Sequence, residues 1–210
     1  MIVIILSFTF TNLPKYKDGG MVFKKVLNTS YSVETYDYYV LTNNHVIYKD
    51  TSSYNSFSYS VTDAFNVEYN AQVIASDPNY DLAVVKFSSS ESYPVRPLAT
   101  ANSMVGDKII AIGQPSGQKN AITFGEVQGF TKTNITVNPN ADKSNVQFEV
   151  YRHTAPIENG SSGGAVLDYE FNIVGVNYAS SETQSGAHLY SFAIPILKVK
   201  EFLTAQNISV

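Results

Sequence analysis

A glycine- and serine-rich stretch, residues 157–167, contains residue types that suit acyl-transfer chemistry. Its glycines allow a sharp turn and a close approach to another molecule, because no Cβ stands in the way. Ser162 in such a turn can present its hydroxyl outward, while neighbouring N–H groups point at the oxygen of the carbonyl that it attacks. A serine alone is a poor nucleophile, so this chemistry also requires a base and an acid that orients the base.

Two other stretches of the chain supply a base and an orienting acid. His45 follows the β-type run 38–42, and Asp81 precedes the β-type run 82–85. A histidine can take the proton of a serine hydroxyl and return it to the leaving group, while an aspartate fixes the histidine tautomer and stabilises the imidazolium. His45, Asp81 and Ser162 are therefore candidates for a catalytic triad.

The serine motif has two other interpretations. Gly160-x-Ser162-x-Gly164 fits the nucleophile elbow of α/β-hydrolases, in which an aspartate and then a histidine follow the serine. Asp168 and His188 satisfy that order, but the chain after Ser162 is short, and the helix after the elbow would begin at two glycines, which is unfavourable. A turn between strands that carries no chemistry is the other alternative.

Other serines and histidines compete for the proposed roles. Ser116 and Ser161 are alternative nucleophiles, and His153 and His188 are alternative bases. We expect both of these histidines in loops, with His153 near the substrate cleft. An isolated histidine or aspartate next to a strand is usually a surface or turn residue, so the joint occurrence of the three candidates counts for more than each residue alone.

Taken together, these stretches resemble the trypsin-like serine proteases, and among them the HtrA branch. The matching segments follow the family's order and span most of the chain: residues 40–47 (VLTNNHVI), 77–84 (DPNYDLAV), 106–107 with 111–113 (GD and AIG), 160–164 (GSSGG) and 192–195 (FAIP). In the family's motif the serine followed directly by two glycines attacks, which implies Ser162. The resemblance also implies His45 as the base, Asp81 as its partner, and the N–H groups of Gly160 and Ser162 as the oxyanion hole.

The resemblance implies an all-β fold with two six-stranded antiparallel, chymotrypsin-like β-barrels and a short C-terminal helix. Composition agrees, because 44% of the residues are hydrophobic and Tyr, Asn, Ser, Thr and Val are abundant, which favours strands and turns around a core. We expect one protease domain over residues 1–210, with an N-terminal barrel of about 1–92 and a C-terminal barrel of about 98–210. The connection would lie at 88–97, which contains two prolines and no periodicity.

Alternating and apolar runs predict the individual elements. Strands are expected at residues 1–10, 21–23, 36–42, 58–61, 68–75, 82–87, 108–112, 121–130, 145–150, 165–167, 173–179 and 189–194. Turns and loops are expected at residues 15–20, 28–35, 48–58, 76–79, 114–117 and 180–186. An apolar stripe at helical spacing predicts a closing helix over 195–205.

Charge and composition narrow the possible partners. A net charge of −4 argues against a nucleic-acid partner, and the absence of cysteine excludes structural disulfides. The histidines lack metal-ligand spacing, so we expect neither a metal nor another cofactor. Residues 1–10 are too short for a membrane-spanning helix, and we interpret them as a strand, with a truncated export segment as the alternative.

Two departures from the family limit what the resemblance implies. Digestive trypsin-like enzymes carry an aspartate before the nucleophile that pairs with a new N-terminus after zymogen cleavage. Ser161 stands there in this chain, so that activation switch is unavailable. We expect no PDZ domain after residue 210 and no clear export signal or anchor. The resemblance favours an extracellular or cell-envelope location and allows a trimer, while polypeptides are the expected substrates.

The resemblance also places a substrate pocket beside the nucleophile. Its predicted lining comes from residues 156–159, 177–179 and 190–192, and includes Pro156, Asn159, Asn177 and Tyr190. The position at the bottom of the pocket aligns near Pro156, and because no acidic residue occupies it, we do not expect a preference for Lys or Arg. The family favours small aliphatic side chains, and Tyr190 would make the pocket shallower than usual.

The predicted function is a serine endopeptidase that cleaves unfolded or damaged proteins after small or medium apolar residues. One alternative is a catalytically silent trypsin-like fold that binds peptides or unfolded chains. Another is a serine hydrolase that acts on a non-peptide ester.

Overall fold

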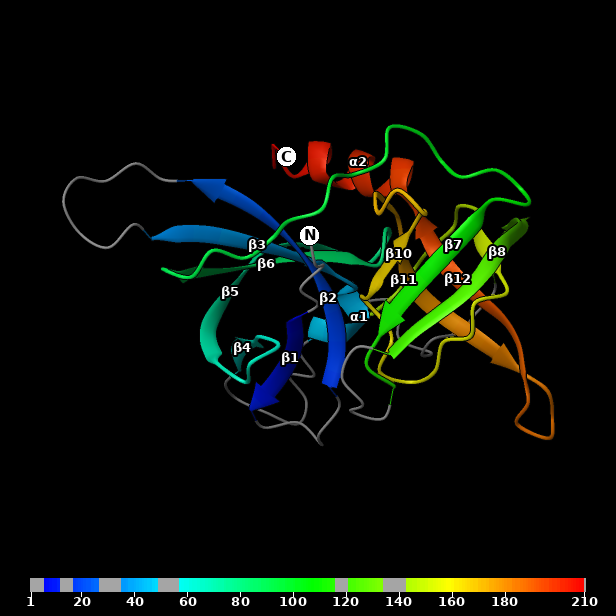
Figure 1. The fold of residues 1–210 in the computed structure, drawn as a ribbon, viewed down its shortest axis with the longest axis horizontal. Helices are drawn as coiled ribbons and strands as arrows, with labels where there is room; N and C mark the ends of the chain where they lie inside the picture. The colour runs from blue at the N-terminus through cyan, green and yellow to red at the C-terminus, as the bar shows by residue number, and fades with distance from the viewer. Residues whose placement is uncertain are drawn as a thin grey trace.

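The computed structural model describes residues 6–11, 17–26, 35–48, 57–115, 121–133 and 143–209. Two β-sheets lie side by side in it, and helix α2 (Ile196–Ala205) lies above them (Figure 1). The chain is mostly β with little helix, as predicted. Within the described ranges, no helix is both long enough and apolar enough to cross a bilayer.

The first sheet is a closed six-stranded antiparallel barrel in the order β1-β2-β3-β6-β5-β4. Its strands are β1 (Leu6–Thr11), β2 (Lys17–Val26), β3 (Tyr36–Thr42), β4 (Ser58–Thr62), β5 (Glu68–Asp77) and β6 (Leu82–Ser89). Pairing between β1 and β4 closes it. Alternate residues of β3 and β6 fill its interior, including Tyr38, Val40, Val85 and Phe87.

The turn expected at residues 15–20 is wrong from Lys17 onward. Gly20 pairs with Leu6 of β1, and Met21 pairs with Leu41 of β3. To close the barrel, β2 must pair with both neighbours along its length, and this tertiary demand overrides the turn-forming tendency of the two glycines at 19 and 20.

The second sheet has the order β10-β11-β12-β9-β8-β7, and β10 also pairs with β7. Its strands are β7 (Lys108–Gly113), β8 (Ala121–Thr131), β9 (Val150–His153), β10 (Ala165–Leu167), β11 (Ile173–Glu182) and β12 (His188–Pro195). Residues 180–182, expected in a loop, extend β11 by pairing with β12. Residues 101–107 lead into β7 and form no strand themselves.

The strand expected at residues 145–150 is also misplaced, since β9 begins only at Val150. Before it, Asn145 bonds to the turn at Pro78 in the first half of the chain, and Val146 is buried between the two sheets. The alternation of apolar residues in this segment therefore arises because it packs between the two sheets, and not because it pairs with a neighbouring strand.

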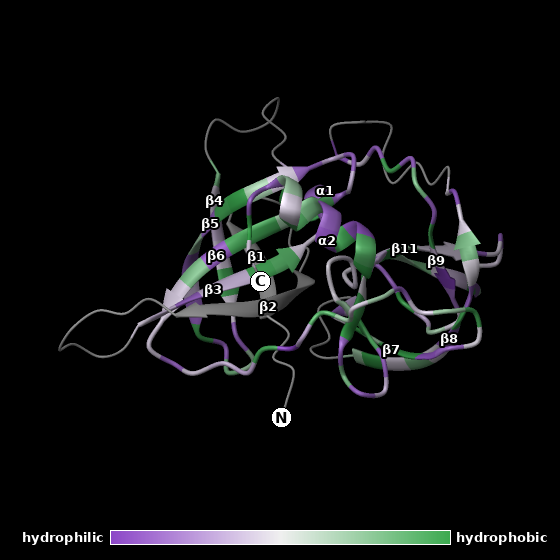
Figure 2. Ribbon diagram, turned by 90° about the horizontal axis from the view of Figure 1, so that it is seen from above, coloured by the Kyte–Doolittle hydropathy of each residue, from purple (hydrophilic) through white to green (hydrophobic). Residues whose placement is uncertain are grey.

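A shared core joins the two sheets. Leu41 and Val84 from the first sheet pack in one cluster with Ile112 and Ile194 from the second. Helix α2 (Ile196–Ala205) adds its buried face, and Figure 2 shows it over the junction of the sheets. The predicted closing helix is thus present, and it begins directly after Pro195. The second helix, α1 (Asn44–Ile47), is one turn long and follows β3.

Candidate active site

His45 and Asp81 are in direct contact in the first half of the chain. His45 Nδ1 lies 2.6 Å from Asp81 Oδ2, and the His45 backbone N–H donates to Oδ1 of the same carboxylate at 2.8 Å. The Asp81 side chain is fully buried, whereas 14% of the His45 side chain is exposed. The hydrogen bond between the carboxylate and His45 Nδ1 is therefore shielded from water. The other ring nitrogen, Nε2, lies on the side of the ring away from Asp81.

The backbone at Asp81 is held in an unusual conformation. Its φ of 49° lies in the left-handed region that residues other than glycine rarely adopt. Its N–H donates to the Pro78 carbonyl at 3.2 Å, and its carbonyl accepts a hydrogen bond from Asn43 Nδ2 at 2.9 Å. Backbone conformations of this kind persist where their surroundings fix them, and they cluster at functional sites.

Ser162 lies in a turn that is fastened to β11. Gly160 and Gly163 have φ of 99° and 78°, where a Cβ would strain the backbone. The Gly163 N–H donates to the Asn177 carbonyl at 3.0 Å, and the Asn177 N–H donates to the Gly164 carbonyl at 2.9 Å. The sequence motif thus forms a rigid turn just before β10.

The N–H groups of this turn differ in whether they have an acceptor. The N–H groups of Ser161 and Gly164 bond within the turn, to the carbonyls of Glu158 and Ser161. In the part of the chain that the structure describes, the N–H groups of Gly160 and Ser162 have no acceptor. These are the two donors that the sequence predicts for an oxyanion hole.

The two candidate serines of the turn differ in exposure. Ser161 is buried, and its hydroxyl oxygen lies 3.4 Å from the Glu158 N–H that donates to it. A Cβ added to Gly113 would come within 2.6 Å of the Ser161 side chain. Ser162 is partly exposed. The geometry therefore favours Ser162 over Ser161 as a nucleophile, and Ser116 lies outside the described residues.

Adjacent residues of β11 contact the two halves of the candidate site. Asn177 holds the Ser162 turn, and the ring of Tyr178 lies edge-on to the His45 ring, with centroids 6.5 Å apart. Among the described residues, no hydrogen bond joins Ser162 Oγ to His45. Such bonds are often long in unliganded enzymes and shorten when substrate binds.

Comparison with known proteins identifies the family. The model of the trypsin-like peptidase domain matches residues 28–176. The chain belongs to this family. The periplasmic serine endoprotease DegP of Salmonella typhimurium is 30% identical over 81% of this chain and 33% of its own length. The chloroplastic protease Do-like 5 of Arabidopsis thaliana is 34% identical over 75% of this chain and 50% of its own length.

Solved structures of proteases have the same fold. An HtrA-type protease solved with a tripeptide matches with a TM-score of 0.72 and 25% identity, over 97% of this chain and 59% of that one. A protease of M. tuberculosis, solved in its active form, matches with a TM-score of 0.71 and 19% identity, over 99% of this chain and 82% of that one. The HtrA resemblance seen in the sequence is thus confirmed, and the chain spans a third to a half of the length of the two curated relatives.

In this trypsin-like domain, the competing histidines lie on strands rather than in the expected loops. His153 is the last residue of β9 and His188 is the first residue of β12. Both belong to strands because His153 pairs with Ser191 of β12 and His188 pairs with Glu182 of β11. His153 is fully buried, and among the described residues neither ring nitrogen has a hydrogen-bond partner. Burial, aided by the nearby His188 and opposed by the Ala155 backbone, lowers the pKa of His153 to about 4. His188 Nε2 lies 2.8 Å from Ser191 Oγ.

The residues predicted to line one substrate pocket do not line the same pocket in the structure. A pocket of about 250 Å³ is lined by Pro156 together with residues of β7 and β8, and neither Asn177 nor Tyr190 lines it. Asn177 is fully buried, and its side-chain amide donates to the Ile112 carbonyl at 2.9 Å. The exposed Tyr190 ring stacks under the Arg152 guanidinium, 4.7 Å from the ring centroid, and Asn159 is exposed.

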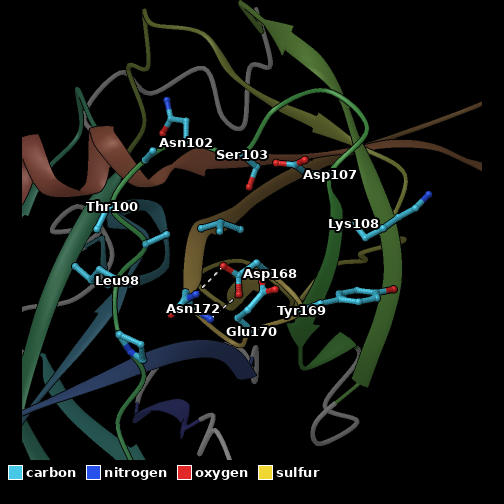
Figure 3. Close-up of a pocket in the computed structure, with 14 residues that line it drawn as sticks. Leu98, Thr100, Asn102, Ser103, Asp107, Lys108, Asp168, Tyr169, Glu170 and Asn172 are labelled. Carbon is cyan, nitrogen blue, oxygen red and sulfur yellow. Dashed lines mark hydrogen bonds between the residues drawn. The ribbon is translucent and has the colours of Figure 1, made fainter.

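A larger pocket, of about 660 Å³, contains none of the triad candidates. It lies where the connection between the sheets meets the β10–β11 turn (Figure 3), and Asp168 there accepts two hydrogen bonds from Asn172. Asp168, the acid of the α/β-hydrolase interpretation, is therefore occupied in closing a turn. The all-β fold itself also contradicts that interpretation.

Two residues support the site in roles that the sequence did not predict. Asn43 fixes the Asp81 carbonyl, and its place two residues before His45 in the matching segment was the available signal. Tyr178 was expected only in the lining of the substrate pocket, but its ring flanks His45, because the sequence does not show which way a side chain of an irregular β-strand points.

Proposed function

We propose that this protein is a serine endopeptidase with a two-barrel, chymotrypsin-like architecture, in which Ser162 attacks the peptide carbonyl. The observation that carries the proposal is the His45 ring held at 2.6 Å by the buried Asp81 carboxylate. Membership of the trypsin-like peptidase family supports it, as do relatives that are named serine endoproteases.

In the proposed reaction, His45 takes the Ser162 proton as the hydroxyl attacks, and Asp81 stabilises the resulting imidazolium. The oxygen of the tetrahedral intermediate accepts hydrogen bonds from the N–H groups of Gly160 and Ser162, which lack acceptors among the described residues. His45 then donates the proton to the leaving amine. Water, activated by the same ring, hydrolyses the acyl-enzyme.

For the substrate, we propose unfolded or damaged polypeptides cleaved after small or medium apolar residues. Pro156, where an acidic residue would select Lys or Arg, supports an apolar preference. A profile from a peptide library tests this, and cleavage dominated by basic residues would contradict it.

The test of the activity is labelling by a fluorophosphonate probe, which reacts only with an activated serine. We expect the wild-type chain to be labelled at Ser162, and Ser162→Ala and His45→Ala to lose the label. Ser185→Ala is a matched control, because this exposed serine lies in the β11–β12 loop. An unlabelled wild-type chain that still bound unfolded polypeptide would support the silent peptide-binding alternative. Hydrolysis of p-nitrophenyl esters without casein would favour the esterase.

A further inference from the structure

A short segment before β9 contacts the helix that carries His45. We call this segment, residues 143–145, the strap. Asn44, the first residue of α1, donates from Nδ2 to the Lys143 carbonyl at 2.9 Å. The Lys143 ammonium lies over the ring of Tyr48, 5.2 Å from its centroid, just after the end of α1. The strap therefore touches both ends of the single helical turn around His45.

The strap also holds the turn that ends at Asp81. The Asn145 backbone N–H donates to the Pro78 carbonyl at 2.7 Å, and Asn145 Nδ2 donates to Asn79 Oδ1 at 2.9 Å. The Pro78 carbonyl is the same group that accepts the Asp81 N–H. One carbonyl oxygen thus joins the strap to the strained backbone of Asp81.

The middle residue of the strap reaches the residue that flanks His45. The hydroxyls of Ser144 and Tyr178 lie 3.2 Å apart. The pairing of β11 with β12 shifts between Asn177 and Ala179, which makes Tyr178 the extra residue of a β-bulge. A bulge changes the direction of a side chain. Because of this bulge, Asn177 can bond to the Ser162 turn while the next residue, Tyr178, places its ring beside His45.

The surroundings of Tyr178 keep its phenol neutral. Burial raises the pKa of Tyr178, the charge on Asp81 raises it further, and the hydrogen bond with Ser144 opposes both. The phenol is therefore within electrostatic reach of Asp81, although it is bonded to the strap.

We propose that Tyr178, held by the strap, is a positioning residue whose ring fixes the His45 imidazole and excludes water from the His45–Asp81 pair. This inference rests on the proposed function, since it concerns the same triad. It predicts that loosening the strap lowers the rate of the chemical step without weakening substrate binding, because no strap residue is assigned a contact with substrate.

The first experiment measures kcat and KM on a denatured protein substrate for Tyr178→Phe, Ser144→Ala and the double variant. Each single change removes one hydrogen bond between the strap and Tyr178, so we expect kcat to fall about fivefold with KM unchanged. The double variant should fall no further than either single variant, because both changes remove the same bond.

The matched control is Tyr151→Phe. Tyr151 is an equally buried tyrosine of β9, and its hydroxyl accepts a hydrogen bond from the Ser103 N–H at 2.6 Å. This change should lower the melting temperature as Tyr178→Phe does, but leave kcat unchanged. Equal loss of kcat in Tyr151→Phe and Tyr178→Phe would overturn the proposal, because general loosening of the core would then explain both.

A second measurement uses no substrate, so it separates failure of this inference from failure of the proposed function. The proton between His45 Nδ1 and Asp81 should give a low-field NMR resonance. We expect Tyr178→Phe to retain the resonance, because the ring remains, and Tyr178→Ala to lose it through faster exchange with water. A folded Tyr178→Ala variant that kept a sharp resonance would overturn the proposed role of the ring.

Discussion

Two histidines of this protein, His45 in α1 and His153 in β9, differ in the features that a general base needs. His45 is partly exposed and bonds to a buried carboxylate, whereas His153 is fully buried, and in the described part of the chain both of its ring nitrogens lack a partner. The pKa of His153 falls to about 4, mainly because burial disfavours the charged ring. A general base must accept a proton and remain reachable, and only His45 has the partner and the exposure for that.

The largest expected effect on kcat comes from replacing His45, and replacing His153 gives the comparison. His45→Ala should lower kcat by a factor on the order of 10⁶, as removal of the base does in a well-studied serine protease. His153→Leu should lower kcat less than tenfold, because it removes no group that we assign to the reaction. Both rates are measured on a denatured protein substrate. A loss of several orders of magnitude in the His153 variant, with the fold intact, would reverse the assignment of the base.

The carboxylate partner can be tested without changing its shape. Asp81→Asn should lower kcat by a factor on the order of 10⁴, because the amide would favour the wrong His45 tautomer. The His45 backbone N–H can still donate to the amide oxygen, so the melting temperature should change little. Wild-type kcat in this variant would show that Asp81 does not orient the ring.

The smallest expected effect is a change in how the free energy of unfolding depends on pH, and it arises from the buried ring of His153. Its pKa is about 4 in the folded state and near 6.5 in an unfolded chain, so the unfolded chain binds more protons between these values. Stability therefore falls as the pH drops from 6.5 through 4, and this residue contributes about 3 kcal/mol of the loss.

Urea unfolding at a series of pH values measures that contribution. His153→Leu should remove about 3 kcal/mol of the difference in unfolding free energy between pH 7 and pH 4, since leucine does not titrate. Asp107→Asn is a useful comparison, because it changes an exposed carboxylate just before β7. An unchanged pH dependence in the leucine variant would mean that His153 has a partner when the protein is in solution.

The contrast between the two histidines also shows how far sequence alone could go. The segment 40–47 predicted β3 and the position of His45, because a regular strand leads directly into the motif. His153 was expected in a loop, and nothing in its neighbours indicates that it faces the inside of a sheet. Burial of a polar residue at a strand end depends on cross-strand partners such as Ser191, which are distant in sequence.

The elements that sequence placed wrongly share a cause. Residues 17–20 and 145–149 look like a turn and a strand locally, but barrel closure and packing between the sheets decide their conformation. The β-bulge at Tyr178 belongs to the same class, because its register is set by the partner strand. The Ser162 turn was predicted correctly, because Gly160 and Gly163 adopt positive φ there and no strand pairing competes with the turn.

We propose that Ser162 acts through His45, and a double-mutant cycle measures the coupling between these two residues. The kcat of Ser162→Ala, His45→Ala and the double variant is measured on one denatured protein substrate, with folding checked by circular dichroism. We predict that the double variant loses no more activity than either single variant, on the order of 10⁶, because a base has nothing to activate once the nucleophile is gone. A double variant whose loss equalled the product of the two single losses, or a fully active Ser162→Ala, would show that Ser162 does not act through His45.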